Sequence, residues 1–150
     1  MNTPRPLLAI SVLAVLFAGA CSWNYSGATT GHLTGGAAAQ VGAITLRPST
    51  TAYQPRKIGT SSPAHVFTLT NPATNSGAAV VSTVQTSDNQ FVIDSTTTTC
   101  TGQTLQPGGN CQVGVGFSPV NIGPQTASLS VEDNAANSPQ TAILTGAGKR

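Results

Sequence analysis

Two stretches in the second half of the chain decide the fold, CQVGVGFSP (residues 111–119) and TASLSVED (residues 126–133). In the first, Val113, Val115 and Phe117 alternate with two glycines, and in the second, apolar residues alternate with serines. Strict alternation of this kind is typical of a β-strand with one face buried and the other in water. Both stretches are therefore predicted to be strands at the surface of a core.

Working outward, five more strand candidates recur at similar spacing. They are AITLRP (43–48), AHVFTLTN (64–71), AAVVSTVQ (78–85), QFVIDS (90–95) and TAILTG (141–146). The segments between them are rich in Gly, Pro and Asn, which favour turns. After the first twenty residues no window keeps a helical period. Seven short strands without helices predict an all-β fold, a seven-stranded antiparallel immunoglobulin-like β-sandwich.

The charge of the chain limits its partners. Among 150 residues there are six basic and four acidic side chains, for a formal net charge of +2 at pH 7. No basic face is available for phosphate groups, so we expect no nucleic acid partner. The sequence also lacks a phosphate-binding loop, a nucleophile elbow, a zinc-protease motif and an acidic calcium loop. We therefore expect no cofactor and no metal.

The first twenty residues have the pattern of a signal peptide. Arg5 precedes a twelve-residue apolar run, residues 7–18, which is short beside the roughly 20 residues of a membrane-spanning helix. Ala18 and Ala20 suit cleavage by the ordinary signal peptidase before Cys21. A cysteine at this place also resembles a bacterial lipobox, in which it is acylated, although the usual lipobox has Leu at the position of Ala18. The predicted signal peptide is residues 1–20, of the lipoprotein type.

Three cysteines help to choose between these two fates. Cys100 and Cys111 are separated by the turn-forming stretch TGQTLQPGGN and are expected to form a disulfide in an exported chain. Cys21 is then the odd thiol, and acylation would remove it. We expect a lipid anchor at Cys21, and Ser22 beside it resembles lipoproteins of the outer membrane. The alternative is a secreted protein with a free or intermolecular Cys21.

Residues 21–42 are predicted to be a flexible tether. Segment 22–42 contains five Gly and almost no hydrophobic periodicity. Its His32 lies alone, so we expect no metal site there. Trp23 and Tyr25 are interpreted either as aromatic residues at the membrane interface or simply as exposed side chains. The folded domain is expected to comprise residues 43–148.

Within that domain the sequence resembles the bacterial choice-of-anchor D repeat, which is related to the abnormal-spindle/Hydin (ASH) class of immunoglobulin-like domains. The resemblance rests on the spacing of the two domain cysteines, on F-x-P at residues 117–119 and on L-T-G-x-G at residues 144–148. Upstream, FTLTN at residues 67–71 agrees, whereas Tyr53 stands where the family usually has Phe. The resemblance implies a seven-stranded sandwich with a disulfide and no catalytic residues. Family members often occur in tandem, and this copy is single.

Candidate catalytic groups are few. Glu132 and Asp133 are adjacent, so on a strand they point to opposite faces and do not form an acid and base pair. His65 is interpreted as a strand-edge residue and not as part of a Ser-His-Asp triad. The hydroxyl-rich loop STTTTC (95–100) is interpreted as a polar connection to the disulfide, with a carbohydrate contact as the alternative.

The favoured functional hypothesis is a non-enzymatic, lipid-anchored module of the cell envelope that serves binding, adhesion or scaffolding. Its expected partners are the membrane, through the anchor, and an envelope protein or an extended peptide paired with an edge strand. A soluble secreted binding module is one alternative, and a small hydrolase on a sandwich scaffold is another. The residues that would bind a ligand are not identified by the sequence.

Overall fold

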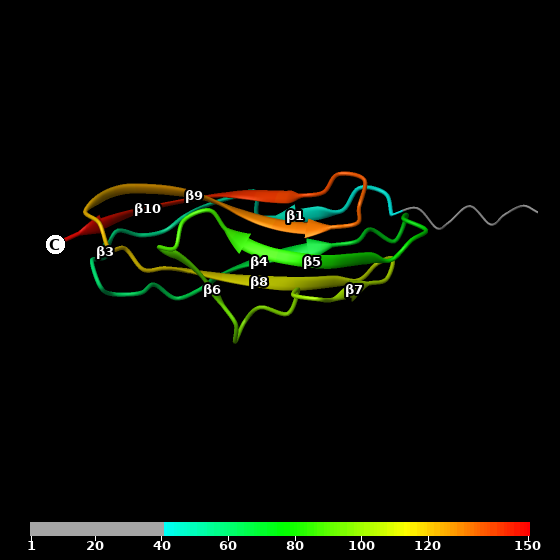
Figure 1. Ribbon diagram of the computed structural model, residues 1–150, viewed down its shortest axis with the longest axis horizontal. Coiled ribbons are helices and arrows are strands. Elements are labelled where there is room, and N and C mark those ends of the chain that lie inside the picture. The colour runs from blue at the N-terminus through cyan, green and yellow to red at the C-terminus, as the bar shows by residue number, and fades with distance from the viewer. Residues whose placement is uncertain (1–40) are drawn as a thin grey trace, which may run out of the picture. The chain divides into compact units, whose positions relative to one another are not determined.

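Two β-sheets packed face to face make up residues 41–150, the part of the chain that the computed structural model describes (Figure 1). The strands are β1 (Thr45–Arg47), β2 (Thr50–Ala52), β3 (Arg56–Lys57), β4 (His65–Thr70), β5 (Ala79–Thr86), β6 (Phe91–Asp94), β7 (Thr104–Leu105), β8 (Asn110–Phe117), β9 (Gly123–Asp133) and β10 (Gln140–Lys149). No helix of this range is long and apolar enough to cross a bilayer. The all-β class is confirmed.

The first sheet has the strand order β1-β4-β8-β6, and the second has the order β2-β10-β9-β5-β7, with β3 also paired to β10. Chain neighbours β4 and β5 lie in different sheets, as do β8 and β9. The chain therefore passes repeatedly between the layers, as expected of an immunoglobulin-like sandwich.

The structure corrects the expected strand count and the expectation that every pairing is antiparallel. All seven predicted strands are present, and β2, β3 and β7 are additional. These three contain two or three residues each and only one large apolar side chain, Leu105, among them, so no alternation is visible in the sequence. β2 and β3 pair with β10 in parallel. The reason is that the chain crosses to the second sheet after β1 and then runs in the same direction as the last strand.

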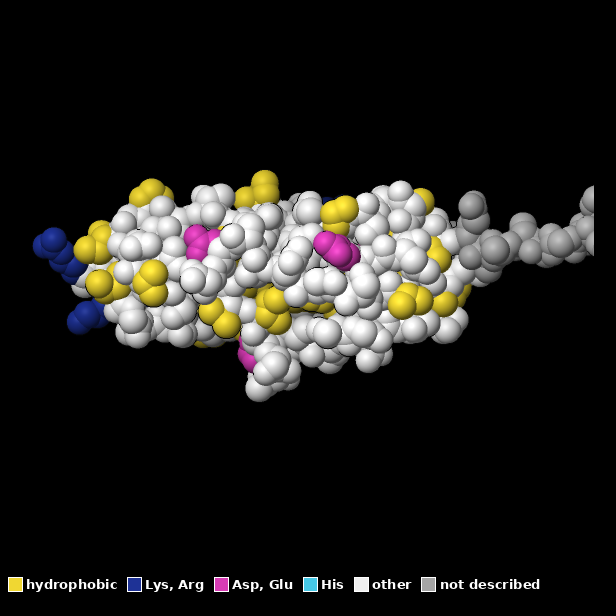
Figure 2. Space-filling model, viewed as in Figure 1, with side chains coloured by type: hydrophobic (Ala, Val, Ile, Leu, Met, Phe, Trp, Pro, Cys, Tyr) yellow, Lys and Arg dark blue, Asp and Glu magenta, His cyan; other side chains and the backbone are white. Residues whose placement is uncertain are grey.

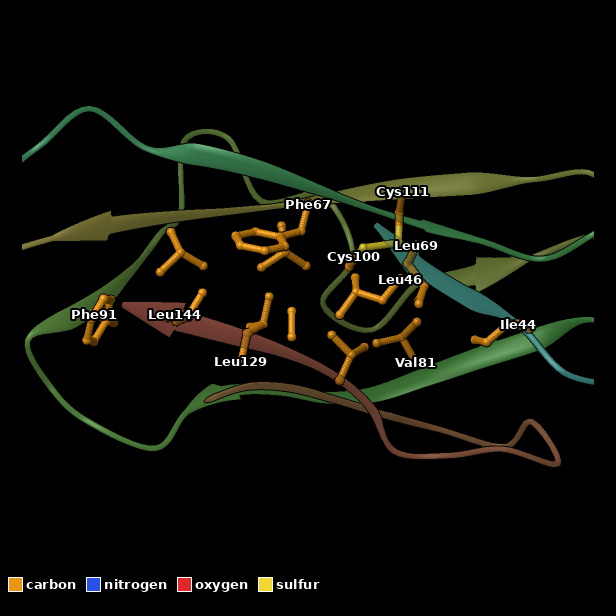
Figure 3. Packing of buried hydrophobic residues seen from close by; sticks show 14 of the residues in the cluster. Ile44, Leu46, Phe67, Leu69, Val81, Phe91, Cys100, Cys111, Leu129 and Leu144 are labelled. Carbon is orange, nitrogen blue, oxygen red and sulfur yellow. A yellow bond between two sulfur atoms is a disulfide. The ribbon is translucent and has the colours of Figure 1, made fainter. Parts of the chain in front are cut away.

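The core lies between the layers and is built from the inward positions of both sheets (Figure 3). Its largest fully buried side chains are Phe67, Phe91, Phe117, Ile44, Leu69, Leu129 and Leu144. In β9 the apolar residues are buried and the intervening serines are partly exposed, as the alternation predicts. Burial of apolar surface at about 25 cal/mol per Å² is the main force that holds the two sheets together.

Two amide side chains, the buried Asn71 and the exposed Asn137, tie the loops at one end of the sandwich. Asn71 is fully buried, and its Nδ2 donates to the carbonyls of Gly77 at 3.0 Å and Leu105 at 2.8 Å. Asn137 exchanges two hydrogen bonds with the backbone of Ile44, at 3.0 and 2.9 Å. Since a buried polar group without a partner is costly, these bonds fix the loops that they join.

Candidate functional site

The disulfide predicted from the cysteine spacing is confirmed. Cys100 and Cys111 are joined with an S–S distance of 2.02 Å, and both side chains are buried. The bond connects the segment after β6 to the beginning of β8, inside the core (Figure 3). Its position among apolar side chains gives it a structural role.

The hydroxyl-rich loop after β6 directs its threonines to the protein backbone. Thr98 Oγ1 accepts a hydrogen bond from the backbone N–H of Gly114 at 3.1 Å, and Thr99 Oγ1 accepts one from Gln112 N at 3.0 Å. Gly114 was expected on the wet face of its strand but is buried, because Thr97 lies over it; a Cβ on Gly114 would meet Thr97 Oγ1 at 1.7 Å. The loop is thus a connection that continues along β8, as expected.

His65 lies at the first position of β4 and is exposed. Its ring contacts Tyr53 edge to face, with centroids 4.7 Å apart. Within residues 41–150 it makes no hydrogen bond to Ser, Asp or Glu, so the structure does not assemble a triad around it. Tyr53 is buried, donates its hydroxyl to the Val115 carbonyl at 2.6 Å, and has a pKa raised by burial to about 12. Tyr53 therefore has a structural role: its hydroxyl bonds to β8 and its ring packs against the ring of His65.

The carboxylates do not converge. Glu132 is exposed, whereas neighbouring Asp133 is half-buried and accepts a hydrogen bond from Ala135 N at 2.7 Å. Burial raises the pKa of Asp133. Hydrogen bonds from the hydroxyl and backbone N–H of Thr96 lower the pKa of Asp94, which is partly exposed to solvent. In the described range no three His, Cys, Asp or Glu residues are grouped in a way that would hold a metal ion.

An open groove of about 360 Å³ lies beside β6 on the outer face of the first sheet. It is lined by Ser61, Ser62, Ala64, Val92, Ile93, Asp94, Ser95, Gly116 and Ser118. The groove exists because Gly116 has no side chain between Val92 on β6 and the segment that carries Ser62. Ser62 Oγ accepts from Phe117 N at 2.8 Å, and Ser61 donates to Ser118, so three of the hydroxyls are used internally. His65 does not line this groove.

The structure also has an open strand edge on β5, whose position was not predicted from the sequence. β7 pairs only with Ala79 and Val80 of β5, and the next bond on this side joins Val81 N to Gln103 O at 2.9 Å. From Ser82 to Thr86, no strand within residues 41–150 pairs with the side of β5 that faces away from β9. The signal available in the sequence was the five-residue run STVQT, which has no charge and no Pro.

Several predictions concern residues outside the described range, which begins at residue 41. They are the signal peptide of residues 1–20, acylation of Cys21, most of the tether, and the interpretations of Trp23, Tyr25 and His32. These stay predictions.

Comparison with known proteins supports the fold. No family model matches the sequence, and no curated protein matches it either. The fold is similar to a protein of unknown function from Porphyromonas gingivalis W83, with a TM-score of 0.58 and 16% identity over 73% of this chain and 48% of that one. It is also similar to secreted serine protease VesC from Vibrio cholerae, with a TM-score of 0.53 and 17% identity over 73% of this chain and 23% of that one.

The ASH / PapD-like domain 7 of human CEP192 matches over almost its whole length. Its TM-score is 0.54, with 13% identity over 97% of this chain and 99% of that domain. By contrast, the chain spans less than half of the Porphyromonas protein and about a quarter of the Vibrio protease. At such low identities the likeness shows the fold alone. That fold is an immunoglobulin-like sandwich of the kind found in ASH and PapD-like domains.

Proposed function

We propose that this protein is a non-enzymatic binding module of the bacterial cell envelope, held at the outer membrane by acylated Cys21. In this proposal the open edge of β5, from Ser82 to Thr86, pairs with an extended segment of a partner protein. The observation that carries the proposal is that Thr83 to Thr86 pair with β9 on one side and with no described strand on the other, while Ser82 lies at a shift in the register. A strand edge with free N–H and C=O groups is a template for another chain.

The register of β5 shows which groups are available. Ser87 N donates to Ser128 O at 2.9 Å, so Gln85 and Thr83 also direct their backbone groups toward β9. The register shifts between Val81 and Thr83, so this alternation does not extend to Val81, whose N–H donates to Gln103 O on the other side. Val84 and Thr86 then direct their N–H and C=O groups to the open side. Val84 is packed against the core, which keeps this backbone in place. A partner strand would gain main-chain hydrogen bonds from a preformed edge.

The other edges of the described sheets offer less. β1 and β2 have three residues each. β6 has four, and Phe91 already uses both backbone groups, its N–H with Asp88 O at 3.1 Å and its carbonyl with the Thr86 hydroxyl at 2.7 Å. β10, the last strand, is paired on both sides, so it is not an edge. β5 is therefore the favoured place for a peptide.

The choice-of-anchor D assignment belongs to the same proposal, and packing supports it. In the L-T-G-x-G motif, Gly146 makes room for the Phe117 ring, and Gly148 makes room for the backbone at Asn121 and for Pro119. The F-x-P and L-T-G-x-G motifs are thus two sides of one contact. Their occurrence together in the sequence has a physical reason.

A photo-crosslinking residue at position 85 tests the edge. Gln85 is exposed on β5, and Thr141 is exposed on the outer face of β10 in the same sheet, two strands away, so position 141 is the matched control. In intact envelopes we expect a covalent adduct with a partner from position 85 and none from position 141. Adding Thr83→Lys should abolish the adduct, since a Lys beside an edge opposes strand addition. Equal adducts from both positions, or an adduct that Thr83→Lys leaves unchanged, would refute pairing at β5.

Palmitate labelling tests the anchor. The wild-type protein should incorporate labelled palmitate and fractionate with the outer membrane, because several acyl chains give stable anchoring. Cys21→Ser should lose the label and be released from the membrane fraction by a high-salt wash that leaves the wild type in place. An unlabelled, soluble wild type would overturn the anchor and favour the alternative of a secreted binding module, without bearing on the edge of β5.

A further inference from the structure

One end of the sandwich combines positive charge with exposed aliphatic side chains, and we call it the cationic tip. It consists of Lys57, Ile58, Val120, Ile122, Lys149 and Arg150. Figure 2 shows the Lys and Arg side chains gathered at the end of the domain where β3 and the last residues lie. The tip is distinct from the groove and from the edge of β5.

Three chain segments are bonded together to form the tip. β3 runs parallel to the end of β10, which places Lys57 beside Lys149. Ile58 N donates to Lys149 O at 2.9 Å, and Gly59 N donates to Pro119 O at 3.0 Å. These bonds connect β3, the end of β10 and the loop between β8 and β9. The charges and the aliphatic residues are therefore held side by side.

The charge of the domain is segregated toward this end. Arg56, Lys57, Lys149 and Arg150 are four of the five basic residues between positions 41 and 150. No ion pair joins any of them to a carboxylate in the described part of the chain. Lys57 and Lys149 are paired neighbours of like charge, an arrangement that costs some stability and that a nearby anionic surface would relieve. A net charge near zero for the whole chain hides this local excess.

The aliphatic side chains of the tip are held outward by the structure. Val120 and Ile122 are 66% and 55% exposed, and Ile58 is 37% exposed. Buried Gln90 holds their loop from beneath, since its Oε1 accepts from Val120 N at 3.0 Å and from Asn121 N at 3.3 Å. A loop fixed in this way keeps its apolar side chains exposed to water, which is unfavourable in free energy. Contact with an apolar medium would remove that unfavourable hydration.

We propose that the cationic tip docks on an anionic phospholipid surface. Val120 and Ile122 would enter the boundary between headgroups and acyl chains, while Lys57, Lys149 and Arg150 contact the phosphates around them. This is how amphipathic surfaces bind membranes, by buried apolar area together with attraction to anionic lipids. A contact with an acidic protein would use the same charges but gives no role to the exposed aliphatic side chains of Val120 and Ile122.

The inference is independent of the lipid anchor and of the β5 edge. The tether would join the domain near Val41, whose carbonyl accepts from Ala136 N beside the β9–β10 turn. The tip lies at the other end of β9 and β10, roughly 30 Å away for a strand of ten residues. A tether of about 20 residues spans up to about 70 Å when extended. The cationic tip could thus contact the same membrane in which an acylated Cys21 would be anchored.

Vesicle co-sedimentation tests the docking without the anchor. The protein secreted with Cys21→Ser carries no acyl group and is mixed with vesicles of phosphatidylcholine, or of phosphatidylcholine and phosphatidylglycerol. We expect binding to the anionic vesicles only, and weakening with salt. Lys57→Gln and Lys149→Gln should each reduce binding about fivefold, as expected for one Lys at an anionic surface. Val120→Ser with Ile122→Ser should reduce it further at unchanged charge.

Matched controls lie elsewhere on the domain. Ile143 on β10 is 55% exposed, like Ile122, and Arg47 on β1 is the remaining basic residue of the described range. Ile143→Ser and Arg47→Gln should leave binding unchanged. The proposal is overturned if anionic vesicles do not bind, or if the controls weaken binding as much as the tip variants do. It is also overturned if polyglutamate binds as strongly as the vesicles and Val120→Ser with Ile122→Ser has no effect, since that outcome identifies an acidic protein as the partner.

Discussion

The ring of Phe117 lies against the backbone of Gly146, in the space that a side chain at position 146 would occupy. A Cβ built on Gly146 would come within 2.6 Å of Phe117 Cε1 and 2.8 Å of its Cζ. Phe117 is fully buried and stacks on Phe91, with centroids 4.8 Å apart, so its ring has no room to withdraw. This contact joins β10 of the second sheet to β8, one of the two inner strands of the first sheet.

Gly146→Ala should destabilise the protein by about 1–3 kcal/mol, because the added methyl group overpacks the core. Chemical denaturation monitored by the far-UV circular dichroism signal measures the change. Gly116→Ala is the matched control, since its Cβ has 3.4 Å to the nearest atom and should cost much less. Equal losses in the two variants would contradict the packing argument.

Phe117→Ala should lower the free energy of unfolding by about 3–5 kcal/mol, because it leaves a cavity among fully buried side chains. Phe117→Leu, which removes less volume, should lower the free energy of unfolding by less. When Phe117→Leu is combined with Gly146→Ala, the double variant should lose less stability than the sum of the two single losses. Such coupling between contacting residues is measured by a double-mutant cycle. Strict additivity would show that the two positions do not share one space.

Reduction of the Cys100–Cys111 bond should lower the melting temperature by several degrees. The two residues are 11 apart in sequence, and closing a loop of that size contributes somewhat under about 3 kcal/mol on the chain-entropy model. Thermal melts with and without a reductant measure the effect, and a Cys100→Ala/Cys111→Ala variant should be insensitive to the reductant. Identical melts of the wild type would show that the bond contributes no stability.

Tyr53 should titrate well above the range of an ordinary tyrosine. Burial raises its pKa to about 12. A raised pKa means that the folded state favours the protonated phenol. Its contribution to stability is therefore complete below pH of about 10 and is lost as the pH rises toward 12. Ultraviolet titration of wild type and Tyr53→Phe measures this, and a difference between the two curves that is centred near a pH of about 10 would contradict it.

Asp133→Asn should raise the melting temperature near neutral pH. One carboxylate oxygen, Oδ2, is buried without a hydrogen-bond partner, and burial raises the pKa of Asp133. The folded state then holds the proton more tightly than the unfolded state, so stability falls as the pH rises from about 4 through the raised value. The variant's advantage should shrink on acidification. Glu132→Gln, at an exposed neighbour, is the control and should change the melting temperature little.

Much of the fold was accessible from alternation alone. Each of the seven segments predicted to be strands corresponds to a strand of the structure. They could be predicted because each buries one face and so repeats its apolar residues with period two. The Cys100–Cys111 pair was also predictable, since local turn chemistry brings the two ends of a short loop together. β2, β3 and β7 were missed because their sequences, TTA, RK and TL, contain no alternating large apolar residues. β1 is equally short, but the alternation there begins before it, with buried Ile44 and Leu46.

The candidate sites were less accessible, because each depends on residues distant in sequence. Gly114 and Gly116 look alike in the sequence, yet Thr97 covers the first, and the second is left as part of an open groove. The edge of β5 is open only because β7 ends after two residues. The composition indicated a module of almost no net charge, which is correct as a sum and does not show the cationic tip.

Alternation, turn residues and cysteine spacing together determined that this chain forms a β-sandwich with one disulfide, because these signals act between near neighbours. Tertiary structure decided which strand edges remain open and where the charges collect. Lys57 and Lys149 are 92 positions apart in the sequence (149 minus 57), and only the parallel pairing of β3 with β10 makes them neighbours. Pairings between distant segments depend on how whole sheets pack, and no local pattern in a sequence records them.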